Sequence, residues 1–240
     1  NFARATKKPQ LLLCEGYMDV NALHQAGFDN AVASLGTALT SGHANLLKRY
    51  TKEVYLTYDS DGAGIKAALR AIPILKEVGI TTKIINMKPY KDPDEFIKAL
   101  GAEAYQERID QAENSFLFEV RMEEQQHDMH DPEGKTAFYN AVAKMLCGFT
   151  EKLERDNYIE AVAAKYMISS DDLRRLVNQQ GLKAGLAGGG RASQSVADAQ
   201  EGMNAIVQSA TQKLLDLGVE EKDIVTTSYT YYPTYDYNSE

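Results

Sequence analysis

Residues 55–64 read YLTYDSDGAG, and this stretch combines a strand, an acidic turn and the start of a helix. Its first four residues are β-formers, and Asp59 and Asp61 follow at once, two residues apart. Apolar side chains then recur with helical spacing as far as Val78. In an open α/β sheet, such a turn lies at the carboxyl end of a strand, where these folds bind ligands.

Both carboxylates of this turn should project from that edge of the sheet. Held close together without a basic neighbour they repel each other, and a divalent cation is the simplest partner that relieves the repulsion. Gly62 and Gly64 follow, and we expect them to let backbone or substrate approach closely.

Similar strand-to-helix changes occur in the rest of the first hundred residues. The predicted strands are residues 11–14, 31–35, 53–58 and 82–87. Strands that alternate with helices indicate parallel βαβ crossovers. We therefore predict an α/β fold with a four-stranded parallel sheet flanked by helices.

The predicted domain organisation has four parts. They are an α/β domain at 1–101, a small helical subdomain at 102–180, a Gly/Ser-rich linker at 181–197 and a truncated α/β tail at 198–240. The tail is short for a domain of its own, and we interpret it as a possible foreign segment.

Acidic residues follow three of the predicted strands. They are Glu15, Asp19, Asp59, Asp61, Asp92 and Asp94. Because parallel strands end at the same edge, these side chains are expected to share one cleft. Carboxylate oxygens suit Mg²⁺ or Mn²⁺ better than zinc, and such a site is typical of phosphoryl or nucleotidyl transfer.

Each acidic pair also has a purely structural interpretation. Asp92 and Asp94 can cap a helix that begins at Pro93, and the Asp59 turn can be a solvated turn. Their joint placement favours the metal site. Lys88 and Lys91 flank the end of the fourth strand and can contact a triphosphate or template backbone, or simply face solvent.

The composition constrains the class of protein. The net charge is −8, with 26 Lys and Arg against 34 Asp and Glu, which is unusual for a chain that grips nucleic acid unaided. Cys14 and Cys147 are the only cysteines, and two reduced thiols indicate the cytoplasm. The sequence has no apolar run long enough to cross a membrane, and its start without Met indicates a fragment.

Four segments together resemble the Toprim segment of bacterial DnaG-type DNA primases. They are 15–20 (EGYMDV), 33–40 (ASLGTALT), 58–64 (YDSDGAG) and 92–95 (DPDE). The resemblance extends over about residues 8–180, in the spacing of the motifs as well as in their residues.

This resemblance implies a Toprim fold with a four-stranded parallel sheet, followed by a helical subdomain of the RNA-polymerase core. It implies a DNA-directed RNA polymerase that makes short RNA primers on single-stranded DNA from ribonucleoside triphosphates during replication, forming an RNA–DNA hybrid. By position, Glu15 would bind metal or move a proton, and Asp19 would complete the acidic shell. The metal ligands would be Asp59, Asp61, Asp92 and Asp94. The backbone at Gly36 and Thr37 would lie beside the catalytic cleft.

The resemblance also implies parts of the primosome machinery outside this chain. We expect a missing zinc-ribbon, where a zinc site would lie, a missing basic template-binding subdomain and a missing C-terminal domain that binds the replicative helicase. The isolated fragment is therefore expected to be inactive. Residues 198–240 instead resemble the opening of a SIMPL-type domain.

Two other functions fit the same residues. A Toprim nuclease or topoisomerase would cleave phosphodiesters, although a topoisomerase needs a tyrosine nucleophile on a further domain. A non-catalytic module could instead bind another replication protein through its acidic edge and helical bundle. Metal titration and strand-cleavage assays separate these alternatives.

Overall fold

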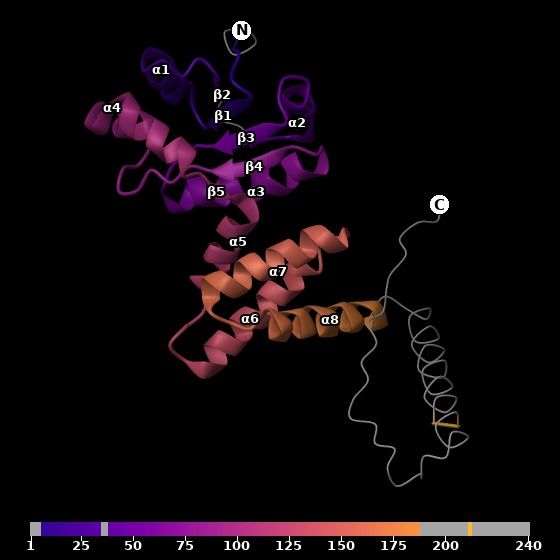
Figure 1. Ribbon diagram of the computed structural model, residues 1–240. Helices are drawn as coiled ribbons and strands as arrows, with labels where there is room; N and C mark the ends of the chain where they lie inside the picture. Colours follow the sequence, from indigo (N-terminus) through magenta and orange to yellow (C-terminus); the bar gives the residue numbers. More distant parts are fainter. Residues whose placement is uncertain (1–5, 35–37, 188–210, 213–240) are drawn as a thin grey trace. The chain divides into compact units, whose positions relative to one another are not determined.

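Figure 1 shows the computed structural model, which describes residues 6–34, 38–187 and 211–212. The chain forms two compact units, and the division falls between Gln126 and His127. By packing, residues 102–126 therefore belong with the sheet, although we predicted a domain boundary after residue 101. None of the helices in the described ranges is both long and apolar enough to span a lipid bilayer.

The first unit contains a sheet with the strand order β2-β1-β3-β4-β5. The strands are β1 (Gln10–Cys14), β2 (Ala31–Ala33), β3 (Glu53–Leu56), β4 (Thr81–Ile84) and β5 (Glu113–Asn114). The first four strands are parallel to one another, and β5 is antiparallel to β4. The predicted four-stranded parallel sheet is confirmed. The added β5 has two residues, which is too short for a strand period to show in a sequence.

The central strands β1 and β3 run side by side and end together. Leu13 pairs with Leu56, and the backbone N–H of Thr57 extends the ladder by donating to the Leu13 carbonyl at 3.0 Å. The residues that follow β1 and β3 therefore leave the sheet as neighbours. This register places Glu15 beside the turn that begins at Asp59.

Helices cover both faces of the sheet (Figure 1). They are α1 (Tyr17–Gln25), α2 (Ser41–Leu47), α3 (Gly62–Glu77), α4 (Pro93–Asp110) and α5 (Ser115–Glu124). One core cluster joins Leu56 of β3 to Leu75 of α3, and it also includes side chains of α2 and α5. The other joins Tyr55 of β3 to Leu23 of α1 and Phe96 of α4. Successive strand residues point to opposite faces, so both faces of β3 are buried.

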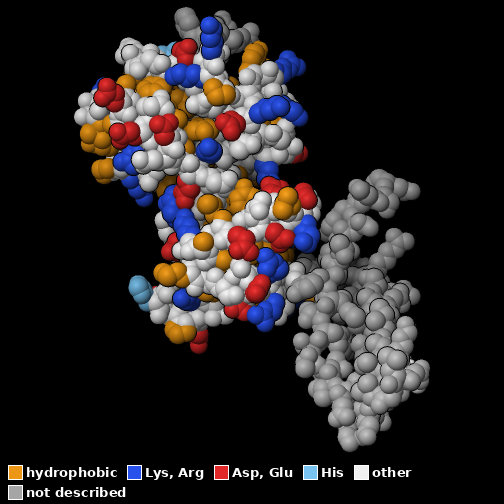
Figure 2. Space-filling view, viewed as in Figure 1, with side chains coloured by type: hydrophobic (Ala, Val, Ile, Leu, Met, Phe, Trp, Pro, Cys, Tyr) orange, Lys and Arg blue, Asp and Glu red, His pale blue; other side chains and the backbone are white. Residues whose placement is uncertain are grey.

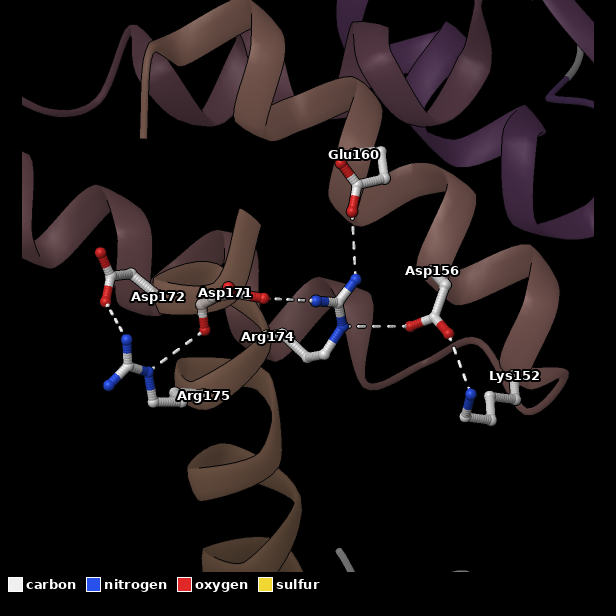
Figure 3. Close-up of polar contacts among 7 residues, drawn as sticks. All are labelled: Lys152, Asp156, Glu160, Asp171, Asp172, Arg174 and Arg175. Atoms are coloured by element: carbon white, nitrogen blue, oxygen red, sulfur yellow. Dashed lines mark hydrogen bonds and ion pairs between the residues drawn. The ribbon is translucent and has the colours of Figure 1, made fainter. Parts of the chain in front are cut away.

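The second unit contains the helices α6 (Pro132–Leu146), α7 (Lys152–Tyr166) and α8 (Ser170–Ala187). Phe138 is fully buried, and its ring lies 4.9 Å from that of Tyr166. Ion pairs join α8 to α7 on the outside of this packing (Figure 3). Arg174 contacts Glu160 at 3.1 Å and Asp156 at 3.6 Å. The predicted helical region after the sheet is confirmed.

Helix α8 continues to Ala187 and so occupies the start of the predicted linker at 181–197. Leu182 and Lys183 are good helix formers, and they outweigh Gly181 at this helix end. Residues 188–197 lie outside the described residues. The predicted tail at 198–240 does too, apart from 211–212, which are helical.

Candidate metal centre

The carboxyl ends of β1 and β3 bring Glu15 and Asp59 together. The Oε1 atom of Glu15 accepts a hydrogen bond from the backbone N–H of Asp59, with an N···O distance of 3.2 Å. The pKa of Glu15 is raised, first by burial and then by the negative charges of Asp59 and Asp61. That hydrogen bond and the more distant Lys91 lower the same pKa. The net rise shows that burial and the acidic neighbours together outweigh these two stabilising contacts.

The turn after β3 also contacts the loop after β4. The pKa of Asp59 is raised mainly by burial, and the charges of Asp92 and Asp61 raise it further. Lys91 opposes that rise, because its Nζ atom lies 3.5 Å from Oδ2 of Asp59. The backbone N–H of Ser60 donates to the Lys91 carbonyl at 2.7 Å. The two acidic loops therefore lie against each other.

Asp19 reaches the same place from helix α1. Its side chain is 8% exposed, and its Oδ2 atom accepts a hydrogen bond from the Gly16 N–H at 3.3 Å. Burial raises the pKa of Asp19 to about 6, and the charges of Asp92, Asp59 and Asp94 contribute to the rise. Three carboxylates, one from the turn after β3 and two from the start of α4, thus act on one side chain.

Asp61 and Asp92 are helix caps as well as members of this group. Oδ1 of Asp61 accepts from the N–H groups of Ala63 and Gly64, each at 2.9 Å, and these bonds lower the pKa of Asp61. Oδ1 of Asp92 accepts from the Glu95 N–H at 2.8 Å. The structural interpretation of both residues is therefore correct. It does not exclude the metal site, because each carboxylate also has a second oxygen.

Asp94 and the two lysines lie at the margin of the group. Asp94 is half-buried and pairs with Lys98 through a 2.6 Å contact between its Oδ2 atom and Nζ. Lys88 is exposed and lines a pocket that also includes Asp59, Ser60 and Arg121. The predicted backbone contacts at Gly36 and Thr37 lie outside the described residues.

The chemistry of this donor set fits a divalent cation. Its oxygens come from carboxylates, the ligand type that Mg²⁺ and Mn²⁺ prefer. Three of the carboxylates, those of Glu15, Asp19 and Asp59, have raised pKa values, which a nearby positive charge would reverse. Within the described ranges, however, no three His, Cys, Asp or Glu side chains already surround a single point as ligands. A bound ion would therefore take its remaining ligands from water, from substrate phosphate or from carboxylates that rotate toward it.

The part of the chain that holds the acidic group matches a known protein family. Residues 12–97, which contain the complete acidic group, match the Toprim-like family. The chain carries the Toprim region of a bacterial DnaG-type primase. Residues 116–171 match the DnaB-helicase binding domain of primase.

Curated relatives extend the match beyond the sheet. DNA primase of Clostridium acetobutylicum is 34% identical over 218 residues, which cover 89% of this chain and 36% of that protein. DNA primase of Enterococcus faecalis is 35% identical over 185 residues, covering 75% of this chain and 30% of that protein. This primase region therefore spans about a third of the length of these relatives.

Solved primase structures share the fold. A DnaG catalytic domain bound to single-stranded DNA is 32% identical, with a TM-score of 0.57, and the match covers 69% of this chain and 53% of that one. The RNA polymerase domain of Mycobacterium tuberculosis DnaG, bound to a DNA duplex with a 6-nucleotide overhang, is 28% identical with a TM-score of 0.60. That match covers 69% of this chain and 54% of the solved chain.

Two expectations about the rest of the primase region change. The expectation that the helicase-binding domain is missing was wrong, because residues 116–171 match such a domain. The sequence shows only helical periodicity there, and a protein-binding helix surface has no residue pattern as distinctive as a carboxylate cluster. The SIMPL-type resemblance of residues 198–240 finds no support in these comparisons.

Sequence reasoning missed one support beneath the acidic edge and the partner of another. The Thr57 hydroxyl lies 2.8 Å from the Tyr105 hydroxyl, and both side chains are fully buried. Gly64 also lies so close to the backbone of Asp59 that a Cβ atom there would overlap the Asp59 carbonyl. The predicted close approach is thus confirmed at Gly64, but Gly62 faces open space. A Thr two residues before the acidic pair was the only sign of the first support.

Proposed function

We propose that this region is the metal-binding part of a DNA primase that joins ribonucleotides into short primers on single-stranded DNA. One observation carries the proposal. Carboxylates from the ends of β1 and β3 and from α1 lie at a single edge of the sheet, where burial, and after it the charges of acidic neighbours that include Asp92 at the start of α4, raises the pKa values of Glu15, Asp19 and Asp59. The likeness to DNA primases supports nucleotidyl transfer as the reaction that uses them.

The proposed roles follow from the surroundings of each side chain. A bound Mg²⁺ or Mn²⁺ would neutralise phosphate charge and lower the pKa of the attacking 3′-hydroxyl. Asp59 and Asp61 would hold it together with Asp92 and Asp94, while Asp19 closes the acidic shell from α1. Glu15 would either join these ligands or accept the proton of the hydroxyl, and its raised pKa suits proton exchange.

The groups proposed to contact phosphate are Lys88 and Lys91, at the margin of the acidic group. Lys91 already lies beside a carboxylate of the group, and Lys88 lines the neighbouring pocket. We assign to both the binding of the incoming triphosphate or of the template backbone. On the face drawn in Figure 2, Lys and Arg alternate with Asp and Glu over the described residues. Because the net charge of the chain is −8, a larger basic surface for the template would come from another part of the full-length protein.

Partners are proposed on the same basis. The template is single-stranded DNA, as in the solved catalytic domain that was bound to it. Residues 116–171 would contact the replicative helicase, in line with their family match. The free thiols of Cys14 and Cys147 fit a reducing compartment, and we place the reaction in the cytoplasm.

Substitution in the full-length protein tests the proposal. Asp59→Ala and Asp61→Ala are each expected to abolish metal-dependent primer synthesis on single-stranded DNA. Asp131→Ala is the matched control, because Asp131 caps α6 in the second unit and should leave synthesis intact. Retained synthesis in both acidic variants would remove the assignment.

Metal titration and a cleavage assay separate the alternatives. Calorimetry with Mn²⁺ should give saturable heat, whereas a non-catalytic module without an ion site should give none. Incubation of labelled single-stranded DNA with Mg²⁺ should leave the strand uncut. Cleavage that depends on Asp59 would instead identify a Toprim nuclease.

A further inference from the structure

A buried polar contact lies directly beneath the acidic edge. The hydroxyls of Thr57 and Tyr105 are 2.8 Å apart, and the Thr57 hydroxyl donates to the sulfur of Met87 at 3.4 Å. With the single Thr57 proton directed at Met87, the Tyr105 hydroxyl donates to Thr57. All three side chains are fully buried.

The surroundings of this contact are apolar. Tyr105 packs edge-on against Phe28, with ring centroids 5.1 Å apart, and against Phe96 at 5.7 Å. Phenylalanine and valine would fill the same space without polar atoms that need partners. Burying two hydroxyls therefore costs desolvation free energy that apolar side chains would not. What the pair adds is a hydrogen bond that fixes the relative orientation of the two side chains.

Each partner in the contact leads to a part of the acidic group. Thr57 stands two residues before Asp59, and Met87 stands four residues before Lys91. Both segments continue into the turns that the Ser60 to Lys91 backbone hydrogen bond holds together.

Tyr105 contacts the start of α4, where Asp92 and Asp94 stand, through Phe96. Gly101, with φ 82° and ψ 179°, interrupts α4, so Tyr105 follows a break in the helix that Asp92 caps. The Phe96 ring spans this break by packing on Tyr105. The backbone N–H of Phe96 donates to the Asp92 carbonyl at 3.0 Å. Tyr105 is therefore packed against the first turns of α4.

We propose that Thr57 and Tyr105 are positioning residues, whose hydrogen bond sets the spacing between the Asp59 turn and the Asp92 turn and thereby the affinity of the site for a divalent cation. This inference rests on the proposed function, because it assumes that the acidic group binds metal. Neither side chain touches the ion or the substrate. The contact acts by fixing the strand end and the helix start that carry the carboxylates.

A double substitution separates positioning from stability. In Thr57→Val/Tyr105→Phe both hydroxyls disappear and the shapes are kept, so the stability cost of an unpaired buried group is avoided. We expect Mn²⁺ affinity, measured by calorimetry, to fall about tenfold, the lower end of the effect of substituting residues that orient metal ligands. The melting temperature without metal should stay close to that of the wild type.

Three further variants make the result specific. Thr57→Ser keeps the hydroxyl and should retain Mn²⁺ affinity. Tyr105→Phe alone should weaken binding, and it serves as the test should the double variant fail to fold. Thr82→Val is the matched control, because Thr82 is a buried threonine of β4 whose hydroxyl has no partner among the described residues. It should leave affinity unchanged.

The outcomes distinguish the two proposals. If the wild type shows no saturable Mn²⁺ binding, the proposed function fails and this inference fails with it. If the wild type binds Mn²⁺ and the folded double variant, or Tyr105→Phe in its place, binds with the same affinity, only the positioning role is overturned. An equal loss in Thr82→Val would also overturn it, since the effect would then be a general one of buried threonines.

Discussion

Helices α3 and α6 begin in the same way but in different surroundings. Asp61 caps α3 and Asp131 caps α6, and each is followed three residues later by a glycine. A Cβ atom on Gly64 would overlap the carbonyl of Asp59, and one on Gly134 would overlap the carbonyl of Asp128. The local design of the two turns is thus nearly identical.

The difference lies in what the rest of the fold places beside each turn. Asp59 follows a central strand and lies close to Glu15, Lys91 and Asp92. Asp128 is exposed and lies in the segment before α6. An aspartate cap with a closely packed glycine is therefore a way to start a helix. It becomes part of a candidate metal site only where other strand ends supply further carboxylates.

The glycines give the strongest test of this comparison. Gly64→Ala should destabilise the first unit by about 3 kcal/mol, because the new methyl group must displace backbone, and Mn²⁺ binding should be lost with the displaced Asp59. Calorimetry and thermal unfolding measure the two effects. Gly62→Ala is the control, since that position faces open space and should be neutral.

Gly134→Ala completes the test in the second unit. It should cost a similar amount of stability, because its methyl group meets backbone in the same way, but it should leave Mn²⁺ affinity unchanged. Equal loss of metal binding in the Gly64 and Gly134 variants would contradict the distinction between the two turns.

A pH titration probes the burial of Asp19 and the acidic residues around it. The folded pKa of Asp19 is about 6, above its ordinary value of 3.8, so the folded state holds the extra proton between these values. Without metal, stability should therefore fall as pH rises from about 4 to about 6. The ionised Asp19 should therefore destabilise the folded state at neutral pH, and Asp19→Asn should remove this penalty, which is on the order of 1 to 2 kcal/mol after allowance for solvent screening.

The measurement is thermal unfolding of wild type and Asp19→Asn across that pH range in a chelator. The two curves should converge at low pH, where Asp19 is protonated in both folded and unfolded states, and the variant should be the more stable at pH 7. Parallel curves would show that neither burial nor the acidic neighbours raise the pKa of Asp19.

The caps separate a shared structural role from a local chemical one. Asp61→Ala and Asp131→Ala should each cost about 1 kcal/mol of stability through the lost cap. Only Asp61→Ala should weaken Mn²⁺ binding in calorimetry. Asp61→Asn keeps a side-chain acceptor for the helix N–H groups, so weak Mn²⁺ binding at normal stability in this variant would isolate the effect of charge.

The smallest effect is expected at Lys91. Its contact with Asp59 is an exposed ion pair, so Lys91→Met should change stability by less than about 1 kcal/mol. Its ammonium group competes with a bound cation for Asp59, and Mn²⁺ affinity should therefore rise by a few fold. Lys152→Met is the control, because Lys152 pairs with Asp156 on α7 of the second unit, away from the acidic group. A fall in affinity on loss of Lys91 would show that the lysine supports the metal site.

Much of the first unit could be predicted because its patterns are local. The strand and helix around residues 55–64 follow from β-formers, an acidic turn and a helical apolar period that lie next to each other in the chain. Gly64 was recognised as a place of close approach, but its partner, the Asp59 carbonyl, was not. The two-residue β5 and the helical end of α8 carried too short or too mixed a pattern to be recognised.

The sequence by itself determined where the carboxylates stand along the chain and which of them begin helices, because capping and strand formation depend on residues a few positions apart. Only the tertiary structure decided which carboxylates meet and what supports them. Glu15 contacts Asp59 across 44 residues, and Thr57 contacts Tyr105 across 48. Electrostatic repulsion and buried hydrogen bonds depend on distance in space, and parallel packing of the sheet sets that distance.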